Sequence, residues 1–392
     1  MKRLVRVLGP LVLLLVADSA HAQLTMQMTN GWNFTFSGNV NIFGMYQSQG
    51  DNGDVDSPGA LTGVGGKGFF FGTGLLPAFS TFEAKGKEGN TDLAVHFGFA
   101  PQVQCGGRNH DCFGAQIDMR QVYLTAGGSW GQILAGKELG LFNRQNILND
   151  QTLFGVGATG IAPGGTTLGR IGFGYIYPNF VGQITYSTPG GKPGQLSIGL
   201  FDPSAFGPYT ELKTPRVEAE VTYKKDKLAL FANGTVQNGK DPASGSKTAV
   251  GGGGGLTYKG EHFSIHGSGY YGSGIGTTLQ FNGVGSGSFF DVAADADGDL
   301  RSSYGYFGQL TYTTGKATLA GSYGSSYLKS TDSELRFKTE NSLVSGGLYY
   351  QATKSLKLVG EIDYQWSDNT DAILNPEKNT AWTGAFGLML FF

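Results

Sequence analysis

Residues 356–366 read LKLVGEIDYQW, and apolar and polar side chains alternate along most of this stretch. Successive side chains of a β-strand point to opposite faces, so the alternation predicts a strand with one apolar and one polar face. The apolar face would carry Leu356, Leu358, Ile362, Tyr364 and Trp366, and the polar face Lys357, Glu361, Asp363 and Gln365. We therefore expect Leu358 to face lipid and its neighbour Val359 to face water.

The same alternation recurs along the chain, for example in residues 32–42, 216–223 and 382–392. Sixteen segments qualify as strands, and seven short connections alternate with eight long ones between them. Short turns on one side and long loops on the other, with an even number of strands, are typical of bacterial outer-membrane barrels. The sequence thus predicts an all-β fold, a closed antiparallel transmembrane β-barrel of about sixteen strands.

Two of the sixteen segments are long. Residues 68–86 are expected to form one uninterrupted strand. Residues 171–188 contain Pro178, which cannot donate a hydrogen bond to a neighbouring strand. We interpret Pro178 as the site of a bulge within one strand, because a hairpin there would make the strand count odd.

The first residues resemble an export signal. Three basic residues precede the apolar run LVLLLV at 11–16, and the segment ends in Ala-His-Ala at 20–22. This pattern predicts a secretory signal peptide at 1–22 that is removed, which leaves residues 23–392 as a single barrel domain. The alternative, a membrane anchor, would need an apolar run of roughly 20 residues.

The composition fits an exported barrel and excludes some partners. Glycine supplies 66 of 392 residues, more than double the usual fraction of about 7%. Phenylalanine and tyrosine are abundant, at 27 and 18 residues. The formal net charge of −2 provides no basic surface for nucleic acid, so we expect no nucleic-acid partner.

No motif for catalysis or for a bound metal or cofactor emerges. A catalytic site needs a nucleophile and a base held together, and no Ser or Asp is singled out beside a histidine such as His96. Residues 291–299 (DVAADADGD) partly match a calcium loop but lack its spacing and closing glutamate. We therefore expect no enzyme, no metal site and no cofactor.

At this point the chain resembles a known family, the trimeric general porins of Gram-negative bacteria. The resemblance rests on DMRQVYLTAGG at 118–128, the turn SWGQ at 129–132, ILAGKELG at 133–140, the long connection that follows, and the ending WTGAFGLMLFF at 382–392. It implies that this third loop, about 138–170, folds into the barrel and forms a constriction. Glu138, Arg144 and Asp150 are its candidate constriction residues.

The resemblance also implies partners. The protein would be a homotrimer in the outer membrane, in contact with lipid and lipopolysaccharide. The terminal Phe392 would be read by the barrel-assembly machinery.

The expected function is a water-filled channel for passive diffusion of ions and small hydrophilic solutes. Charged side chains on the inner wall would set its field. The candidate pore-lining residues are His96, Arg170, Arg216, Glu218, Glu220, Lys357, Glu361 and Asp363. The alternatives are a channel that prefers a sugar, phosphate or carboxylate and, with less support, an outer-membrane enzyme or an adhesin.

Cys105 and Cys112, in CGGRNHDC, are expected to form a disulfide, because exported proteins meet an oxidising compartment. A metal site with His110 and Asp111 is the weaker alternative. Thiol labelling of the purified protein without reductant should modify neither cysteine. Two reactive thiols would contradict the disulfide.

Overall fold

A computed structural model describes residues 24–29, 31–50, 61, 68–101, 117–159, 166–281, 292–369 and 378–392. The cysteine pair and the segment predicted as a leader lie outside these residues.

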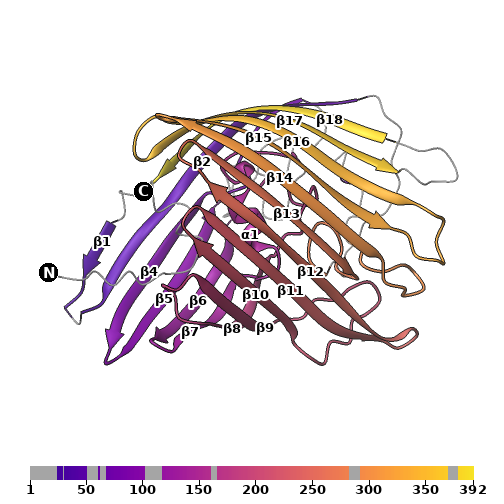
Figure 1. Ribbon diagram of the computed structural model, residues 1–392, viewed down its shortest axis with the longest axis horizontal. Coiled ribbons are helices and arrows are strands. Elements are labelled where there is room, and N and C mark those ends of the chain that lie inside the picture. Colours follow the sequence, from indigo (N-terminus) through magenta and orange to yellow (C-terminus); the bar gives the residue numbers. More distant parts are fainter. Residues whose placement is uncertain are drawn as a thin grey trace.

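The described chain is almost entirely β-structure (Figure 1). Its strands are β1 (Leu24–Gln27), β2 (Asn33–Gln49), β3 (Gly68–Gly72), β4 (Phe79–Glu88), β5 (Thr91–Pro101), β6 (Ile117–Gly128), β7 (Gly131–Leu139), β8 (Phe180–Ser187), β9 (Gly194–Phe201), β10 (Arg216–Lys225), β11 (Leu228–Asp241), β12 (Gly245–Lys259), β13 (Phe263–Ser273), β14 (Ser302–Thr314), β15 (Ala317–Lys329), β16 (Lys338–Gln351), β17 (Leu356–Asn369) and β18 (Lys378–Phe391). The described helices are α1 (Arg144–Asn149) and the 3-10 turn η1 (Gln151–Phe154).

The strands close into a ring. From β4 to β18 each strand pairs antiparallel with the next, and β2 pairs with β4 on one side and with β18 on the other. The register that closes the ring runs from Ala381 opposite Gln49 to Phe391 opposite Asn39. The predicted closed antiparallel barrel of sixteen strands is confirmed. The short strand β1 is an addition to it and pairs with the first residues of β2.

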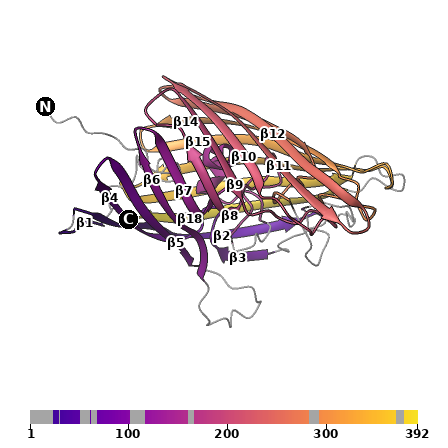
Figure 2. The ribbon, with the colours of Figure 1, turned by 90° about the horizontal axis from the view of Figure 1, so that it is seen from below.

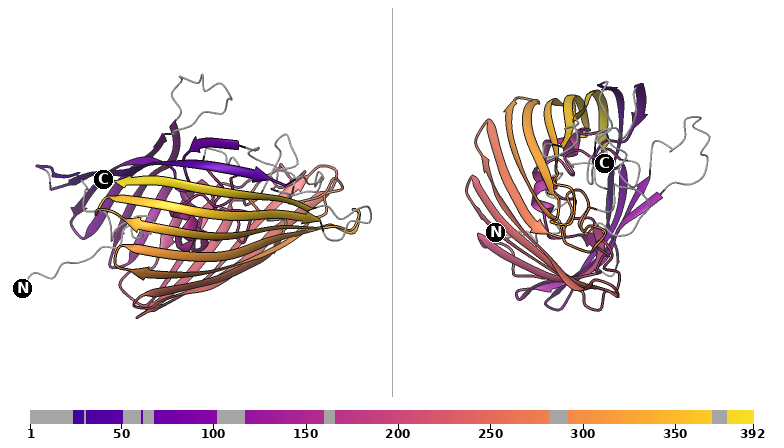
Figure 3. Two further views of the ribbon diagram at one scale, coloured as in Figure 1. Left: turned by 90° about the horizontal axis from the view of Figure 1, so that it is seen from above. Right: turned by 90° about the vertical axis from the view of Figure 1, so that its right-hand side faces the viewer.

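The two faces of the wall differ as the alternation predicted. Outward-facing apolar side chains are exposed on the described chain, among them Ile362 at 63% and Phe386 at 64%. Their inward-facing neighbours Asp363 and Ala385 are almost fully buried. The view along the barrel shows why, because coiled segments occupy the space inside the ring (Figure 3, right).

Short connections join the strands on the side where β1 and the end of β18 lie. Between β14 and β15 the turn contains Gly315 at φ 56°, a left-handed conformation that glycine adopts without a steric penalty. The residues between β10 and β11 include Asp226 at φ 51°, in the same region. In outer-membrane barrels short turns face the periplasm, which assigns this end of the barrel to that side.

Two predicted strand boundaries were wrong. The predicted strand 68–86 is divided into β3 and β4, which both lie beside β2 (Figure 2). The side chains of Asn39 and Asn41 on β2 donate to the carbonyls of Pro77 and Leu76 in the interruption, at 3.0 and 2.9 Å. These amides replace the hydrogen bonds that a continuous strand would have made.

The second error concerns residues 171–188. Strand β8 starts only at Phe180, so Pro178 precedes the strand and makes no bulge in it. Residues 171–176 are buried inside the barrel, and they belong to the connection before the strand. Their apolar character, read as a strand face, reflects burial within the barrel.

Val359 also departs from its prediction. Its side chain faces inward, as expected, but it is only 4% exposed and packs with Phe43, Val156 and Tyr349. The inner wall at this point is therefore covered by protein, and a charge at Val359 would not reach water.

Neither described helix is long and apolar enough to cross a membrane.

Replacing the outward-facing Leu358 by arginine should destabilise the barrel. A guanidinium on the lipid face near mid-bilayer costs about 2–4 kcal/mol. The free energy of unfolding, measured by denaturant titration in lipid vesicles, should fall by about that amount. Asn90→Arg, in the exposed turn between β4 and β5, is the control and should leave it unchanged. Equal losses in both variants would show that Leu358 does not face lipid.

Candidate functional site

The connection between β7 and β8, residues 140–179, is here called the inner segment. Its described parts are 140–159, with α1 and η1, and 166–179. Figure 1 shows α1 among the strands, and the view along the barrel places the coil within the ring (Figure 3). The hydrogen bonds that hold this segment explain its position.

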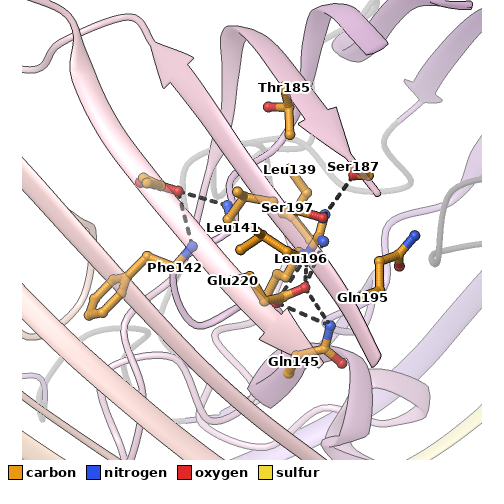
Figure 4. A network of polar contacts seen from close by, with 12 residues as sticks. Leu139, Leu141, Phe142, Gln145, Thr185, Ser187, Gln195, Leu196, Ser197 and Glu220 are labelled. Atoms are coloured by element: carbon orange, nitrogen blue, oxygen red, sulfur yellow. Dashed lines mark hydrogen bonds and ion pairs between the residues drawn. The ribbon is translucent and has the colours of Figure 1, made fainter. Parts of the chain in front are cut away.

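Strand β10 holds the start of the inner segment through two carboxylates. Glu218 accepts hydrogen bonds from the backbone N–H groups of Leu141 and Phe142, at 2.7 and 3.0 Å. Glu220 accepts from the Arg144 guanidinium at 2.7 Å and from the Gln145 amide at 3.1 Å (Figure 4). Both carboxylates face inward because β10 places alternate residues on one face. The charged wall thus supplies the hydrogen bonds that free backbone N–H groups need.

A carboxylate on β17 holds the middle of the segment. Glu361 accepts from the backbone N–H groups of Val156 and Gly157, at 2.8 and 2.6 Å, and from the Tyr349 hydroxyl at 2.5 Å. Thr159 then reaches the seam where the barrel closes and donates to Gln47 on β2 at 2.8 Å. The inner segment therefore crosses from β10 to the opposite wall.

Strands β14 to β16 complete the attachment. Gln309 on β14 accepts from the N–H of Gln151 at 2.7 Å and donates to the carbonyl of Asn149 at 2.9 Å. Arg170 donates to the carbonyl of Leu343 at 2.8 Å and to the hydroxyls of Ser345 and Ser322. Each of these bonds joins the segment to an inward-facing group of the wall.

Within the segment a buried polar group ties its two halves together. Asp150 accepts from the N–H of Thr152 at 3.0 Å and from the Tyr175 hydroxyl at 2.8 Å. The Arg170 guanidinium lies 3.9 Å from the same carboxylate. Burial raises the pKa of Tyr175 well above its ordinary value, and the Asp150 carboxylate raises it further. The tyrosine thus stays protonated and keeps its hydrogen bond at any physiological pH.

Glycines allow the close approach of the segment to the wall. A Cβ added at Gly324 on β15 would overlap the carbonyl oxygen of Phe173. A Cβ added at Gly155 would overlap the Glu361 carboxylate. These positions exclude any larger residue unless the segment moves.

A second connection, which the sequence did not reveal as an inner element, also enters the barrel. Between β13 and β14, Gln280 donates to Glu218 at 2.8 Å, and the carbonyl of Thr278 accepts from the N–H of Tyr177 at 2.8 Å. Ile275 and Phe281 are buried in the same cluster as Phe142 of the inner segment. The sequence signal that could have predicted this inner position is the presence of apolar residues in the otherwise polar stretch GSGIGTTLQF at 272–281.

The structure places the predicted site residues in two groups. Arg170, Glu218, Glu220 and Glu361 contact the inner segment or belong to it, as do the predicted constriction residues Arg144 and Asp150. Glu138, at the end of β7, accepts from Gln121 at 2.7 Å and from the N–H of Leu139 at 2.7 Å.

Three of the other four are buried on the inner wall, and the fourth, Lys357, is half-buried against the inner segment. Arg216 lies 3.1 Å from Glu218 and stacks over the rings of Phe201 and Phe281. His96 was expected to face water, and this was wrong. It is buried, and its ring stacks on that of Tyr123 with 4.7 Å between the ring centres. Lys357 lies over the ring of Phe154 at 3.8 Å. Asp363 is buried.

A barrel closed on itself, with polar inward positions and an internal segment fixed across it, has the architecture of a membrane channel. The model of the Gram-negative porin family matches residues 11–372. The chain belongs to the Gram-negative porins. This porin is an integral β-barrel of the outer membrane, a channel for the diffusion of small solutes.

Solved structures share the fold of this porin at low sequence identity. The outer-membrane channel DcaP of Acinetobacter baumannii is 15% identical with a TM-score of 0.67, and the match covers 94% of this chain and 99% of that one. The anion-selective porin of Comamonas acidovorans is 14% identical, with a TM-score of 0.64 and coverage of 92% and 100%. The trimer form of OmpT of Vibrio cholerae is 13% identical, with a TM-score of 0.54 and coverage of 92% and 99%. A sequence comparison with curated proteins gives no match.

The glycine at 324 gives a direct test of how the inner segment is held. Gly324→Ala should push the segment away from the wall, because overpacking costs typically about 1–3 kcal/mol. Amide hydrogen exchange at Phe173 and Gly174 should accelerate by about tenfold, in line with that cost. Gly321→Ala is the control on the same strand, since a Cβ there points outward and meets nothing within 4 Å. Equal exchange in both variants would contradict the close packing of the segment against β15.

Proposed function

We propose that the inner segment sets the width of this porin, so that solutes diffuse through the part of the barrel that the segment leaves open. The supporting observation is the set of bonds to Glu218, Glu220 and Glu361, which fix the segment to two opposite walls. A peptide held at both sides narrows a barrel more reliably than a mobile loop. In this proposal Glu138, Arg144 and Asp150 position the constriction.

The predicted pore-lining residues then have two roles. The buried groups Arg170, Arg216, Glu218 and Glu361 determine where the segment lies, and so act on the pore through its shape. His96, Lys357 and Asp363 support the wall beneath the open path. Glu220 has both roles. It holds the inner segment through its ion pair with Arg144, and the Arg144 side chain is itself partly exposed.

General diffusion of small hydrophilic solutes is the function best supported. The described inner wall carries both signs of charge, with neighbouring pairs such as Glu83 with Lys85 at 2.6 Å and Lys87 with Asp92 at 2.8 Å. Paired charges of this kind wet the wall without forming a continuous track for one sugar or one ion. A preference for anions is the second candidate function.

The family and the fold point to a channel rather than an enzyme. We propose that this porin catalyses no reaction. Support comes from His96, whose neighbours are Tyr123 and Glu83 and include no serine nucleophile among the described contacts. Its ring packs as part of the wall.

The proposal also covers assembly and export. We propose a homotrimer in the outer membrane, supported by the trimer form known for the similar OmpT. Residues 1–22 would be removed on export, Cys105 and Cys112 would be bridged, and lipopolysaccharide would surround the outer rim. The final residue Phe392 would be recognised by the barrel-assembly machinery.

Deleting residues 155–165 tests the role of the inner segment. The deletion removes the attachment of Val156 and Gly157 to Glu361 on β17, so it should widen the path and raise single-channel conductance in planar bilayers. A deletion of residues 190–191, in the exposed connection between β8 and β9, is the control and should leave conductance unchanged. Heat-modifiable migration in electrophoresis verifies that both barrels are folded. A folded variant with unchanged conductance would refute the constriction.

A further inference from the structure

The periplasmic end of the barrel contains a cavity beside α1. It measures about 240 Å³ and lies between Gln145 and Asn149 of the helix and the inner wall of β10 to β12. The strands contribute Thr222 and Lys224 of β10, Phe231 of β11, and Thr257 and Lys259 of β12. The cavity therefore lies between α1 of the inner segment and the inner wall.

The charges that line this cavity are mostly positive. Among its described lining residues are three lysines, Lys224, Lys227 and Lys259, and a single carboxylate, Asp226. Lys224 and Lys259 face inward, because they continue the inward rows of Glu220 and Thr222 on β10 and of Thr257 on β12. In the described structure, no carboxylate lies within 4 Å of either ammonium group.

Several inward-facing carboxylates of the wall, beside the cavity and elsewhere, already have hydrogen-bond or ion-pair partners. Glu220 lies on the same inward face of β10 as Lys224, two inward positions away. It forms its ion pair with Arg144 at 2.7 Å. Several strands away around the ring, on β4 and β5, Glu83 pairs with Lys85 and Asp92 with Lys87. Glu361, on the opposite wall, is buried and accepts hydrogen bonds from the inner segment. The described lining of the cavity therefore carries more positive than negative groups, three lysines against Asp226.

We propose that Lys224 and Lys259 form a binding site for small anions at the periplasmic mouth, which gives this porin a preference for anions. The site suits ions with two negative charges, such as short dicarboxylates or phosphate, because two ammonium groups line one cavity. The neutral lining around them combines fixed polar groups with apolar ones. The Gln145 amide donates to Glu220 and the Thr257 hydroxyl donates to Asn149 at 3.3 Å, whereas Leu148 and Phe231 are apolar. A site of fixed polar groups with unpaired cations raises the local concentration of anions.

This inference rests on the proposed function, since it requires solutes to pass the cavity. It names the class of solute that the open path favours. Glucose and other neutral sugars would gain nothing from the two lysines.

The reversal potential in a KCl gradient across a planar bilayer tests the proposal. The unmodified porin should prefer chloride over potassium. The double variant K224Q/K259Q should lower the chloride-to-potassium permeability ratio by about three- to fivefold, as expected for removal of two charges in a wet site. K225Q is the matched control, because Lys225 is the exposed neighbour of Lys224 on the opposite face of β10. It should leave the ratio unchanged.

A second measurement tests binding itself. Succinate or inorganic phosphate, added to both chambers, should reduce the chloride current of the unmodified porin, whereas glucose should not. The double variant should need about tenfold more of either anion for the same reduction, as for any lost charged contact. If succinate and phosphate reduce the current at the same concentration, charge alone determines binding at the site. If they differ, the more potent anion identifies the chemical class that the site binds more tightly.

Three results would overturn the inference. They are a preference for potassium in the unmodified porin, an equal change in K225Q, and a reduction by the anions that survives in the double variant. Each of these leaves an open channel, so the proposed function would stand. A folded barrel with no conductance would refute the proposed function and this inference together.

Discussion

Closure of the ring by β2 and β18 is the constraint on which the rest of the structure depends. A bilayer offers no water to an unpaired backbone N–H or C=O, so a sheet can cross it only without edges. The ladder from Ala381 opposite Gln49 to Phe391 opposite Asn39 removes the last two edges. Beyond it, Gly38 and Phe392 exchange two further backbone hydrogen bonds, at 2.9 and 3.0 Å. The outward apolar face and the inward polar face then follow from the alternation within each strand.

A closed barrel creates a second problem, which the inner segment resolves. The wall directs charged side chains inward, and the segment brings backbone N–H groups that have no partners of their own. Glu218 and Glu361 combine the two, each carboxylate accepting two N–H groups of the segment. Hydrogen bonds donated to a carboxylate are stronger than those between neutral groups, so a few of them hold a long connection. Lys224 and Lys259 have no ion-pair partner among the described residues, and the anion site proposed for them would link the architecture to a preference among solutes.

Much of the interior is therefore packed protein. Val156 of the inner segment contacts Val359 and Phe43 of the wall, and Ile275 and Phe281 bring a second connection against it. If the inner segment sets the width of the channel as proposed, that width is a property of a folded core, and changes such as Gly324→Ala would act on it at a distance. Diffusion would then depend on residues that no solute touches.

By itself the sequence determined the fold class, the sixteen strands, the direction in which Leu358 and Phe386 face, and the importance of the third connection. A strand pattern of period two is local, and any register error would turn every apolar side chain to the wrong face. Only the tertiary structure decided what covers the inward face. Whether Val359 meets water or Val156, whether His96 is wet or stacked on Tyr123, and which lysines lack a partner depend on contacts between residues up to about two hundred positions apart. No local pattern encodes such contacts, because they arise only when the ring has closed around the connections that fill it.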